Sequence, residues 1–249
     1  MDFLVLYSIL LMIKIIKPLA KIILALTALF GLMVLFIFLR FDKAIPAGVQ
    51  GEAADRLAHT MLEELSYENY KATDFLSWTF RGKRSYEWSR KEGKCIVSWE
   101  KNKVLLLLDD QQKSKVYINE LAYSGPKKSQ LVDQALAYFN NDSFWLAAPY
   151  KVFDPGVERR YIETAEGQAA LLVTYTTGGS TPGDTYLWHF DAQGVPTSFQ
   201  LWVNMIPIGG LSASWEDWKT TSSGAKIASF HQISFLGIEL TDIQGIKYD

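Results

Sequence analysis

The sequence has few of the residues from which disulfides and metal sites are built. A single cysteine among 249 residues excludes an internal disulfide and a clustered-thiol metal site. This residue, Cys95, alternates with Val97 and Trp99, which predicts a small core residue. The three histidines are dispersed, so we expect neither a metal ion nor a cofactor. The alternative is a metal site made by His189 and His231 with nearby acidic residues, if their strands were neighbours.

The sequence also lacks an excess of charge of either sign. It has 25 basic and 27 acidic residues and a net charge of −2, so it carries no electrostatic footprint for nucleic acid. The glycine-rich nucleotide loops, the nucleophile elbow of hydrolases and the helical motif of zinc proteases are absent as well. We therefore expect no nucleic-acid partner and no enzymatic activity.

Charge is missing altogether from Ile22 to Leu39. These eighteen residues would span roughly 27 Å as a helix, which is close to the hydrocarbon thickness of a bilayer. Three lysines precede the run and two basic residues follow it shortly afterwards. The positive-inside bias then directs the N-terminus to the cytoplasm and the bulk of the chain outside. The sequence predicts one transmembrane anchor over 22–39.

A cleaved signal peptide is the alternative for this region. The hydrophobic part of a signal peptide has 7–15 residues and ends at a small-x-small site, whereas this run is longer and is followed by Arg40-Phe41-Asp42-Lys43. We therefore favour an uncleaved anchor. No cysteine directly follows the run, which excludes a bacterial lipoprotein. The apolar residues Phe3 to Ile13 reach only about 16 Å, so they lie at the interface, or translation begins at Met12.

The remaining chain divides into a linker and one β-rich domain. We expect a basic cytoplasmic or interfacial segment over 1–21, a linker over 40–51 and the domain over 52–249. Near its start, apolar residues from Ala54 to Leu65 recur at helical spacing. Pro126 to Asn140 returns to the same spacing. We expect two or three helices in the domain.

The rest of the domain alternates with a period of two, which is typical of antiparallel strands. Short turns rich in glycine, serine or charged residues separate the runs, among them Gly178-Gly179. We predict about eleven strands, at Leu76–Phe80, Tyr86–Trp88, Cys95–Trp99, Val104–Leu108, Lys115–Glu120, Ala169–Thr177, Thr185–Asp191, Thr197–Asn204, Ser212–Thr220, Lys226–Phe235 and Ile238–Ile243. Each helix has one apolar stripe to cover, so an α+β fold with a large curved sheet around the helices is expected.

The stretch from Asn140 to Val157 marks the change from helical to strand spacing. Asn141 and Asp142 are residue types that stop or cap a helix, and two prolines follow. We interpret Asp142 as a cap, Lys151 as a solvated residue and Asp154 as part of a turn. The alternative is that these three residues form a charged site beside an aromatic wall.

The same stretch, NDSFWLAAPYKVFDPGV, resembles a motif in a family of uncharacterised bacterial envelope proteins. Their fold is like that of the periplasmic lipoprotein carrier LolA. A looser resemblance covers Gly183 to Gln200. By this resemblance the motif positions here are Trp145, Pro149, Lys151, Asp154, Pro155 and Gly156. The resemblance implies an incomplete barrel, a half-barrel whose concave side is closed by helices and holds acyl chains.

Aromatic residues are abundant, at 14% of the chain, with eight tryptophans and twelve tyrosines. Many alternate along the predicted strands and would share an inner face. Filling of the core is one interpretation. The other is an apolar ligand pocket with a few polar groups at its mouth. Its predicted ligand-binding residues are Trp78, Phe80, Tyr86, Trp88, Trp145, Tyr186, Trp188 and Phe190.

Together, these features predict a membrane-anchored envelope protein that binds or carries a hydrophobic ligand, either lipid or an acylated lipoprotein. We expect a single pass through the bacterial inner membrane, with the C-terminal domain in the periplasm. The alternative is a non-catalytic structural or assembly subunit that docks other envelope proteins. Fold-level likeness does not decide between them.

Overall fold

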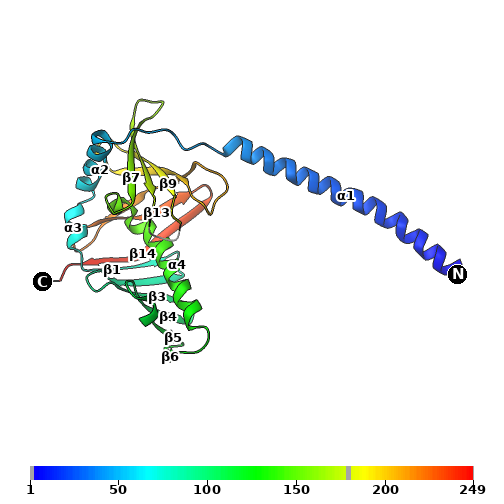
Figure 1. Ribbon diagram of the computed structural model, residues 1–249, viewed down its shortest axis with the longest axis horizontal. Coiled ribbons are helices and arrows are strands. Elements are labelled where there is room, and N and C mark those ends of the chain that lie inside the picture. The colour runs from blue at the N-terminus through cyan, green and yellow to red at the C-terminus, as the bar shows by residue number, and fades with distance from the viewer. Residues whose placement is uncertain (1–2, 178–180, 249) are drawn as a thin grey trace. The chain divides into compact units, whose positions relative to one another are not determined.

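The computed structural model describes residues 3–177 and 181–248, and the chain forms two compact units, Met1–Lys43 and Ala44–Asp249 (Figure 1). The predicted turn at Gly178-Gly179 lies outside the described residues. So do residues 1 and 2 of the predicted N-terminal segment and residue 249 of the domain. Each unit is described by itself.

The first unit contains one continuous helix, α1 (Phe3–Phe41), so the short apolar segment Phe3–Ile13 and the predicted anchor belong to one element. The part from Ile16 to Phe41 is 26 residues long and is apolar enough to cross a membrane, and none of its most apolar window is buried. Its length and composition fit a transmembrane anchor, and a signal sequence fits the same criteria. The chain therefore has a possible membrane anchor, and its retention stays a prediction.

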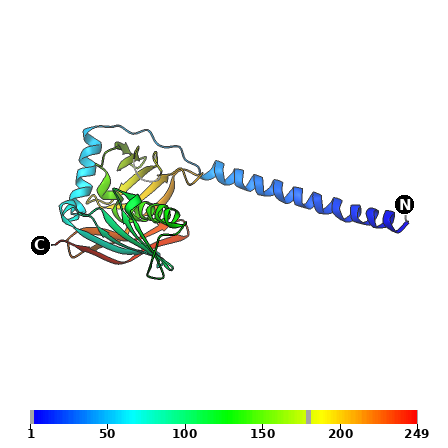
Figure 2. The same cartoon turned by 60° about the horizontal axis from the view of Figure 1, so that its bottom comes forward.

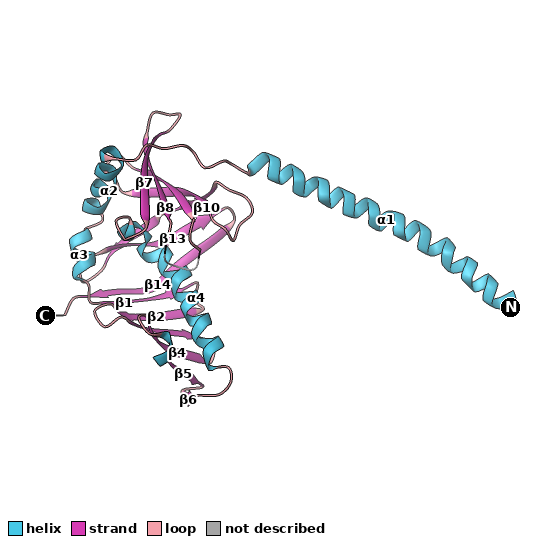
Figure 3. Ribbon diagram, in the orientation of Figure 1, coloured by secondary structure: helices cyan, strands magenta, loops and turns pink. Residues whose placement is uncertain are grey.

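The second unit is built on an open antiparallel sheet of fourteen strands packed with helices, which confirms the expected α+β class (Figure 3). The strands are β1 (Phe75–Phe80), β2 (Arg84–Ser89), β3 (Lys94–Trp99), β4 (Asn102–Leu107), β5 (Lys115–Ile118), β6 (Leu121–Tyr123), β7 (Val157–Glu163), β8 (Ala169–Tyr175), β9 (Thr185–Phe190), β10 (Pro196–Trp202), β11 (Leu211–Ser214), β12 (Glu216–Thr220), β13 (Lys226–Ile233) and β14 (Leu236–Ile246).

The strand order is β6-β5-β4-β3-β2-β1-β14-β13-β11-β10-β9-β8-β7, and β12 pairs with β13 off this path. Most neighbours are consecutive in the chain, as in a meander. There are two exceptions. The pairing of β11 with β13 skips β12, and the pairing of β1 with β14 joins the first strand of the domain to the last, from Phe75 opposite Ile246 to Phe80 opposite Leu240. This long-range pairing joins the two halves of the chain into one sheet.

In the described residues of the domain there are also three α-helices and two 3-10 helices: α2 (Glu52–Glu64), α3 (Tyr67–Ala72), α4 (Lys128–Ala147), η1 (Gln111–Lys113) and η2 (Ala148–Lys151). The predicted stripe of α2 is buried at Ala54, Ala58, Met61 and Leu62, and this helix packs on β7 and β8. Helix α4 packs on β4, β5 and β13. In Figure 2 the green α4 lies between the cyan-green first strands and the yellow later ones. One main core cluster results.

Fourteen strands form in the described part of the chain where eleven were expected, and the differences at β7 and between β11 and β12 have a local cause. The two unexpected strands, β6 and β7, are the edges of the sheet, and β7 reads Val-Glu-Arg-Arg-Tyr-Ile-Glu. Charged side chains are common on edge strands, where they hide the period-two signal. The expected strand over 212–220 is divided at the buried Trp215, whose N–H bonds to the Thr197 carbonyl of β10, and Asp217 follows with φ +52°.

The expected helix end near Asn140 was wrong. Helix α4 continues through Asn141 and Asp142 to Ala147. Its buried residues Val132, Ala135, Phe139, Asp142 and Leu146 follow steps of three and four, the spacing of one helix face. Asp142 is therefore an inward-facing helix residue and not a cap.

Candidate functional site

The eight predicted ligand-binding residues all lie in the main core or pack against it. Five are buried, namely Trp78, Phe80, Tyr86, Tyr186 and Trp188, and Trp88, Trp145 and Phe190 are partly buried. They come from β1, β2, β9 and α4, so the fold does bring residues far apart in sequence into one interior.

Two aromatic groups divide this interior, and α4 supplies a ring to each. Around Phe139, Trp78 stacks on Tyr86 with ring centroids 4.5 Å apart, and Trp88 meets Phe139 edge-on at 5.2 Å. Around Phe144, the Tyr186 ring lies at 4.6 Å. Such centroid distances are those of rings in direct contact. The side chains thus have the geometry of core packing, and their contact with a ligand stays a prediction.

The second group extends past Trp145 toward β13. The Trp145 ring lies 5.9 Å from that of Phe199 and 5.2 Å from that of His231. His231 is fully buried, and its Nδ1 lies 3.0 Å from the Ser214 carbonyl. Burial lowers the pKa of His231 from 6.5 to about 4, only partly offset by this hydrogen bond. The imidazole is therefore neutral near pH 7.

Three indole N–H groups in this interior have no acceptor among the described residues. They belong to Trp78, Trp188 and Trp215, all buried. Buried donors in folded proteins are nearly always satisfied. Trp188 and Trp215 lie near each other, with ring centroids 6.2 Å apart. The interior thus offers hydrogen-bond donors to a polar group from outside the chain.

A buried ion pair connects α4 to β2 and was missed from the sequence. The Arg84 guanidinium donates two hydrogen bonds to the Asp142 carboxylate, at 2.6 and 3.0 Å, and the Tyr86 hydroxyl donates a third. Asp142 is fully buried, and Arg84 is 22% exposed. The guanidinium also lies over the Tyr138 ring, 4.4 Å from its centroid. This arrangement overturns the interpretation of Asp142 as a cap.

The signal for this pair was the position of Arg84, two residues before the predicted strand Tyr86–Trp88 and therefore in the same alternation as Tyr86 and Trp88. An arginine among inward-facing aromatic residues needs a buried carboxylate nearby. Burial, followed by the Asp142 carboxylate, raises the pKa of the Tyr86 hydroxyl far above its ordinary value. Tyr86 therefore stays protonated and acts as a donor. The group is saturated with internal bonds, which fits a structural role.

The other two charged residues of this stretch behave as expected. Lys151 and Asp154 form a pair 3.4 Å apart, with side chains about half exposed. The chain turns after Asp154, whose carbonyl accepts the Val157 N–H, and Gly156 has φ +78°. The interpretation of Lys151 and Asp154 as surface and turn residues is confirmed, and only Asp142 departs from it.

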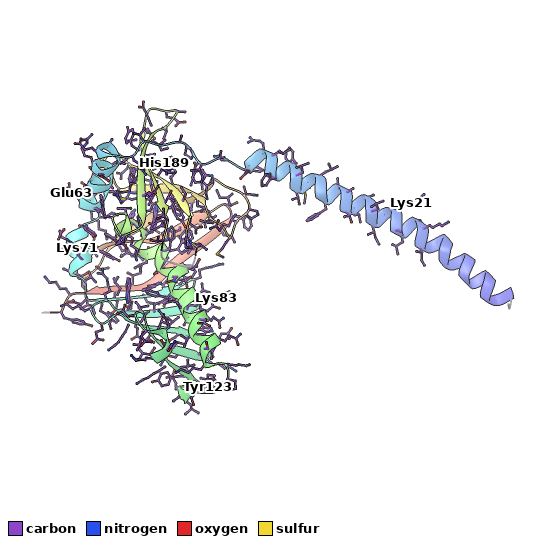
Figure 4. The ribbon with its side chains drawn as sticks, viewed as in Figure 1. Lys21, Glu63, Lys71, Lys83, Tyr123 and His189 are labelled. Atoms are coloured by element: carbon purple, nitrogen blue, oxygen red, sulfur yellow. The ribbon has the colours of Figure 1, made fainter. Side chains whose placement is uncertain are left out.

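The outer surface carries a cleft of about 590 Å³ along α2 and α3. It contains none of the eight predicted residues. Its lining combines two aromatic rings with two carboxylates, from His59, Leu62, Glu63, Ser66, Tyr67, Glu68, Asn69 and Phe153. His59 stacks on Phe153 at 4.5 Å. Figure 4 places the labelled Glu63 on α2, and Lys71, the partner of Glu68, on α3.

The alternative metal site is not supported by the strand order. His189 is on β9 and His231 on β13, and β10 and β11 lie between them. Among the residues that the structure describes, no group of three or more His, Cys, Asp or Glu side chains is placed to hold a metal ion. Cys95 is fully buried, as expected for a core residue.

Comparison with known proteins adds little to this geometry. No protein-family model matches the sequence, and no curated protein does. A crystal structure of a DUF1329 family protein from Desulfovibrio piger is similar, with a TM-score of 0.38 and 8% identity, over 78% of this chain and 94% of that chain. A likeness at this level says nothing about what the chain binds. The resemblance of the NDSFWLAAPYKVFDPGV motif to LolA-like envelope proteins stays a prediction.

Proposed function

We propose that this chain is a membrane-anchored, non-catalytic docking protein of the bacterial envelope. Helix α1 holds it in the inner membrane, and the Ala44–Asp249 unit binds another envelope protein on the periplasmic side. The observation that carries the proposal is the aromatic interior occupied by α4, with Trp78, Tyr86 and Trp188 at 1%, 1% and 0% exposure. Recognition then falls to the outer surface.

The cost of opening the interior supports docking over carriage. Withdrawing α4 would expose Val132, Phe139 and Leu146, at about 1.5–3 kcal/mol each. It would also separate Arg84 from Asp142 and leave the Arg84 guanidinium beside the acyl chain without its carboxylate. Ten methylenes of an acyl chain would return only about 8 kcal/mol. Little would remain for binding after the ordering costs.

The cleft along α2 and α3 is the surface that we assign to the partner. Its Tyr67 and Phe153 rings already have Lys71 and Arg159 over their faces, and Glu68 pairs with Lys71. Glu63 is therefore the lining carboxylate that suits a basic side chain of the partner, and the rings add apolar contact area. A cleft of this size accepts one or two anchoring side chains, which is how a few residues dominate an interface. We therefore expect a partner segment with lysine or arginine beside an aromatic residue.

Photo-crosslinking with the full chain in its own cells tests this proposal. A photoreactive amino acid at Glu68, in the cleft, is expected to yield a discrete crosslinked band in the membrane fraction. The same substitution at Glu166, an exposed glutamate on the β7–β8 turn, provides the matched control and yields none. In the chain that carries the photoreactive residue at position 68, the charge reversal Glu63→Lys removes the band, and Glu166→Lys leaves it. Equal labelling at both positions, or none at Glu68, contradicts the proposal.

A second candidate function is carriage of a hydrophobic ligand, and the three indole N–H groups without acceptors favour it. The carbonyl of a lipid would satisfy a donor such as Trp188. Native mass spectrometry of the purified chain, with competition by a fluorescent fatty acid, tests this function. An acyl chain bound at one per protein, and weakened by Trp188→Phe, would establish carriage and refute the closed interior on which docking rests.

A further inference from the structure

Two neighbouring loops of the domain present large apolar side chains to the outside. The β10–β11 loop (203–210) and the β13–β14 turn emerge at one end of the sheet, because Leu201 pairs with Leu211 and Ala213 pairs with Ile233 (Figures 1 and 3). Phe235 is 86% exposed and Met205 is 76% exposed. We name this surface the apolar rim; it consists of Met205, Ile206, Pro207, Ile208, Phe235 and Leu236.

Charge is absent from the chain on both sides of the apolar rim. No charged residue occurs in the 24 positions from Ala192 to Trp215, or in the twelve from Ile227 to Ile238. At the chain's average of 21% charged residues, about five would be expected in the first segment. The β1–β2 and β3–β4 turns do carry charges, at Arg81, Lys83 and Lys101. Other turns of this sheet are therefore charged, and the lack of charge is a particular feature of the segments around the apolar rim.

The loop of the apolar rim is held in a defined shape. The Asp184 carboxylate accepts the Asn204 N–H at 3.0 Å, and the Asn204 side chain donates to the Pro182 carbonyl at 3.1 Å. The Ile206 N–H bonds to the Val203 carbonyl at 3.0 Å. These hydrogen bonds fix the conformation of the loop that carries the exposed Met205. Contiguous exposed apolar surface with a polar surround marks an interaction site.

We propose that the apolar rim inserts into the interfacial layer of the lipid bilayer. The short linker between α1 and the domain is the reason for choosing the bilayer. Between the end of α1 at Phe41 and Val49, whose N–H bonds to the Tyr161 carbonyl of β7, lie seven residues of linker, 42–48. Fully extended, these reach about 25 Å. A tether this short raises the effective concentration of the bilayer at the domain, so a shallow insertion suffices.

The chemistry of the apolar rim fits lipid better than a protein partner. Protein interfaces use charged and polar groups to set register, and this surface has no charged group. Projecting methionine and phenylalanine side chains need only an apolar, deformable medium. The inference rests on the anchor part of the proposed function and is independent of the α2–α3 cleft.

Site-specific fluorescence quenching with the full chain in vesicles tests the inference. The buried Cys95 is replaced by alanine, and single cysteines for a bimane label are introduced in turn. Phe235→Cys probes the apolar rim. The controls are Leu121→Cys, 73% exposed on the edge strand β6, and Thr220→Cys, at the end of β12 opposite Lys226, which begins β13. In phosphatidylcholine–phosphatidylglycerol vesicles with nitroxide-labelled lipid, label at position 235 is expected to be quenched at least threefold more than at either control.

A second substitution separates insertion from mere proximity. Met205→Asp is expected to reduce quenching at position 235 to the control level, and Leu121→Asp leaves it unchanged. Circular dichroism and thermal unfolding verify the fold of each variant. Equal quenching at all three positions overturns the inference, as does loss of the chain from vesicles on flotation. Strong quenching at 235 without crosslinking at Glu68 would retain the inference and remove the docking proposal.

Discussion

At the scale of single residues, two buried ionisable groups have opposite environments. Asp142 has three side-chain donors, from Arg84, Tyr86 and Asn141, around a fully buried carboxylate. The His231 Nδ1 is hydrogen-bonded to the Ser214 carbonyl, and the ring lies against those of Trp145 and Trp215. The first is charged and compensated, and the second is held neutral by burial. Substitution tests the environment of Asp142, and the pH dependence of unfolding tests that of His231.

Asp142→Ala is expected to lower the free energy of unfolding by about 3–5 kcal/mol, because it leaves the Arg84 guanidinium without its buried partner. Lys151→Ala breaks a half-exposed ion pair and is expected to change the free energy of unfolding by less than about 0.5 kcal/mol. Urea unfolding of the two variants measures both values. A comparable loss in the two variants would show that the Arg84–Asp142 pair is effectively solvated.

Stability is expected to fall with acid because of His231. Its pKa is about 4 in the folded protein and near 6.5 in the unfolded chain, so the unfolded state binds more protons between these values. The free energy of unfolding therefore keeps its full value with respect to His231 above pH 6.5. It falls progressively as the pH is lowered to 4, by about 3 kcal/mol in all. His231→Gln keeps a donor for the Ser214 carbonyl and does not titrate. Urea titrations at several pH values should show a shallower fall for this variant; parallel curves would contradict the assignment.

At the scale of elements, α4 is the helix on which the domain closes. It supplies Phe139 and Phe144 to the two aromatic groups and Asp142 to the ion pair with β2. Asn141 and Asp142 have low helix propensity and usually mark helix ends. Burial of the face that includes Leu146 outweighs this local preference. The helix therefore continues for a further turn and a half past Asn141.

Trp145→Ala on this helix is expected to destabilise the domain by about 2–4 kcal/mol, since the ring packs against Phe199 and His231 but is only partly buried. Asp133→Ala, on the exposed face of the same helix, is the control and should change stability by less than about 0.5 kcal/mol. Thermal unfolding of both variants measures the difference. A Trp145 variant as stable as the control would mean that this end of α4 does not hold the sheet.

At the scale of the whole molecule, the two units differ in what they bury. Among the residues whose burial the structure describes, the buried hydrophobic ones lie between Ala54 and Leu240, whereas apolar side chains of α1, among them Leu24 and Leu39, are largely exposed. A long helix with apolar side chains all round is stable only within lipid or a protein core. The exposure of these side chains supports the proposal that α1 lies in a membrane.

A reporter fused after Asp249 is expected to be active outside the cytoplasm, because basic residues flank the N-terminal side of the apolar run. The fusion should stay with membranes after washing with carbonate, since an apolar helix of 26 residues is not extracted by high pH. Fractionation followed by immunoblotting checks both points. Release of a shortened soluble form beginning near Gly48 would establish a cleaved signal in place of an anchor.

Most of the strands and two of the helices could be predicted from local pattern. The stripe from Ala54 to Leu65 and the alternation Cys95, Val97, Trp99 depend on residues close in sequence. The edge strand β7 was not predicted because Arg159 occupies an inward position of the alternation, where it pairs with Asp55 of α2. The pairing of Arg84 with Asp142 was not predicted, because Asp142 lies 58 residues away in sequence and its residue type suggested a helix cap.

The sequence by itself determined the apolar helix, the α+β class and the set of aromatic residues that face inward, because hydrophobic period and charge are local properties of the chain. Only the tertiary structure decided that β14 closes against β1, that Asp142 pairs with Arg84, and that α4 fills the concave side of the sheet. These outcomes depend on which distant surfaces bury one another. The same residues would line a pocket or fill a core according to where one helix lies, and no period in the sequence records that position.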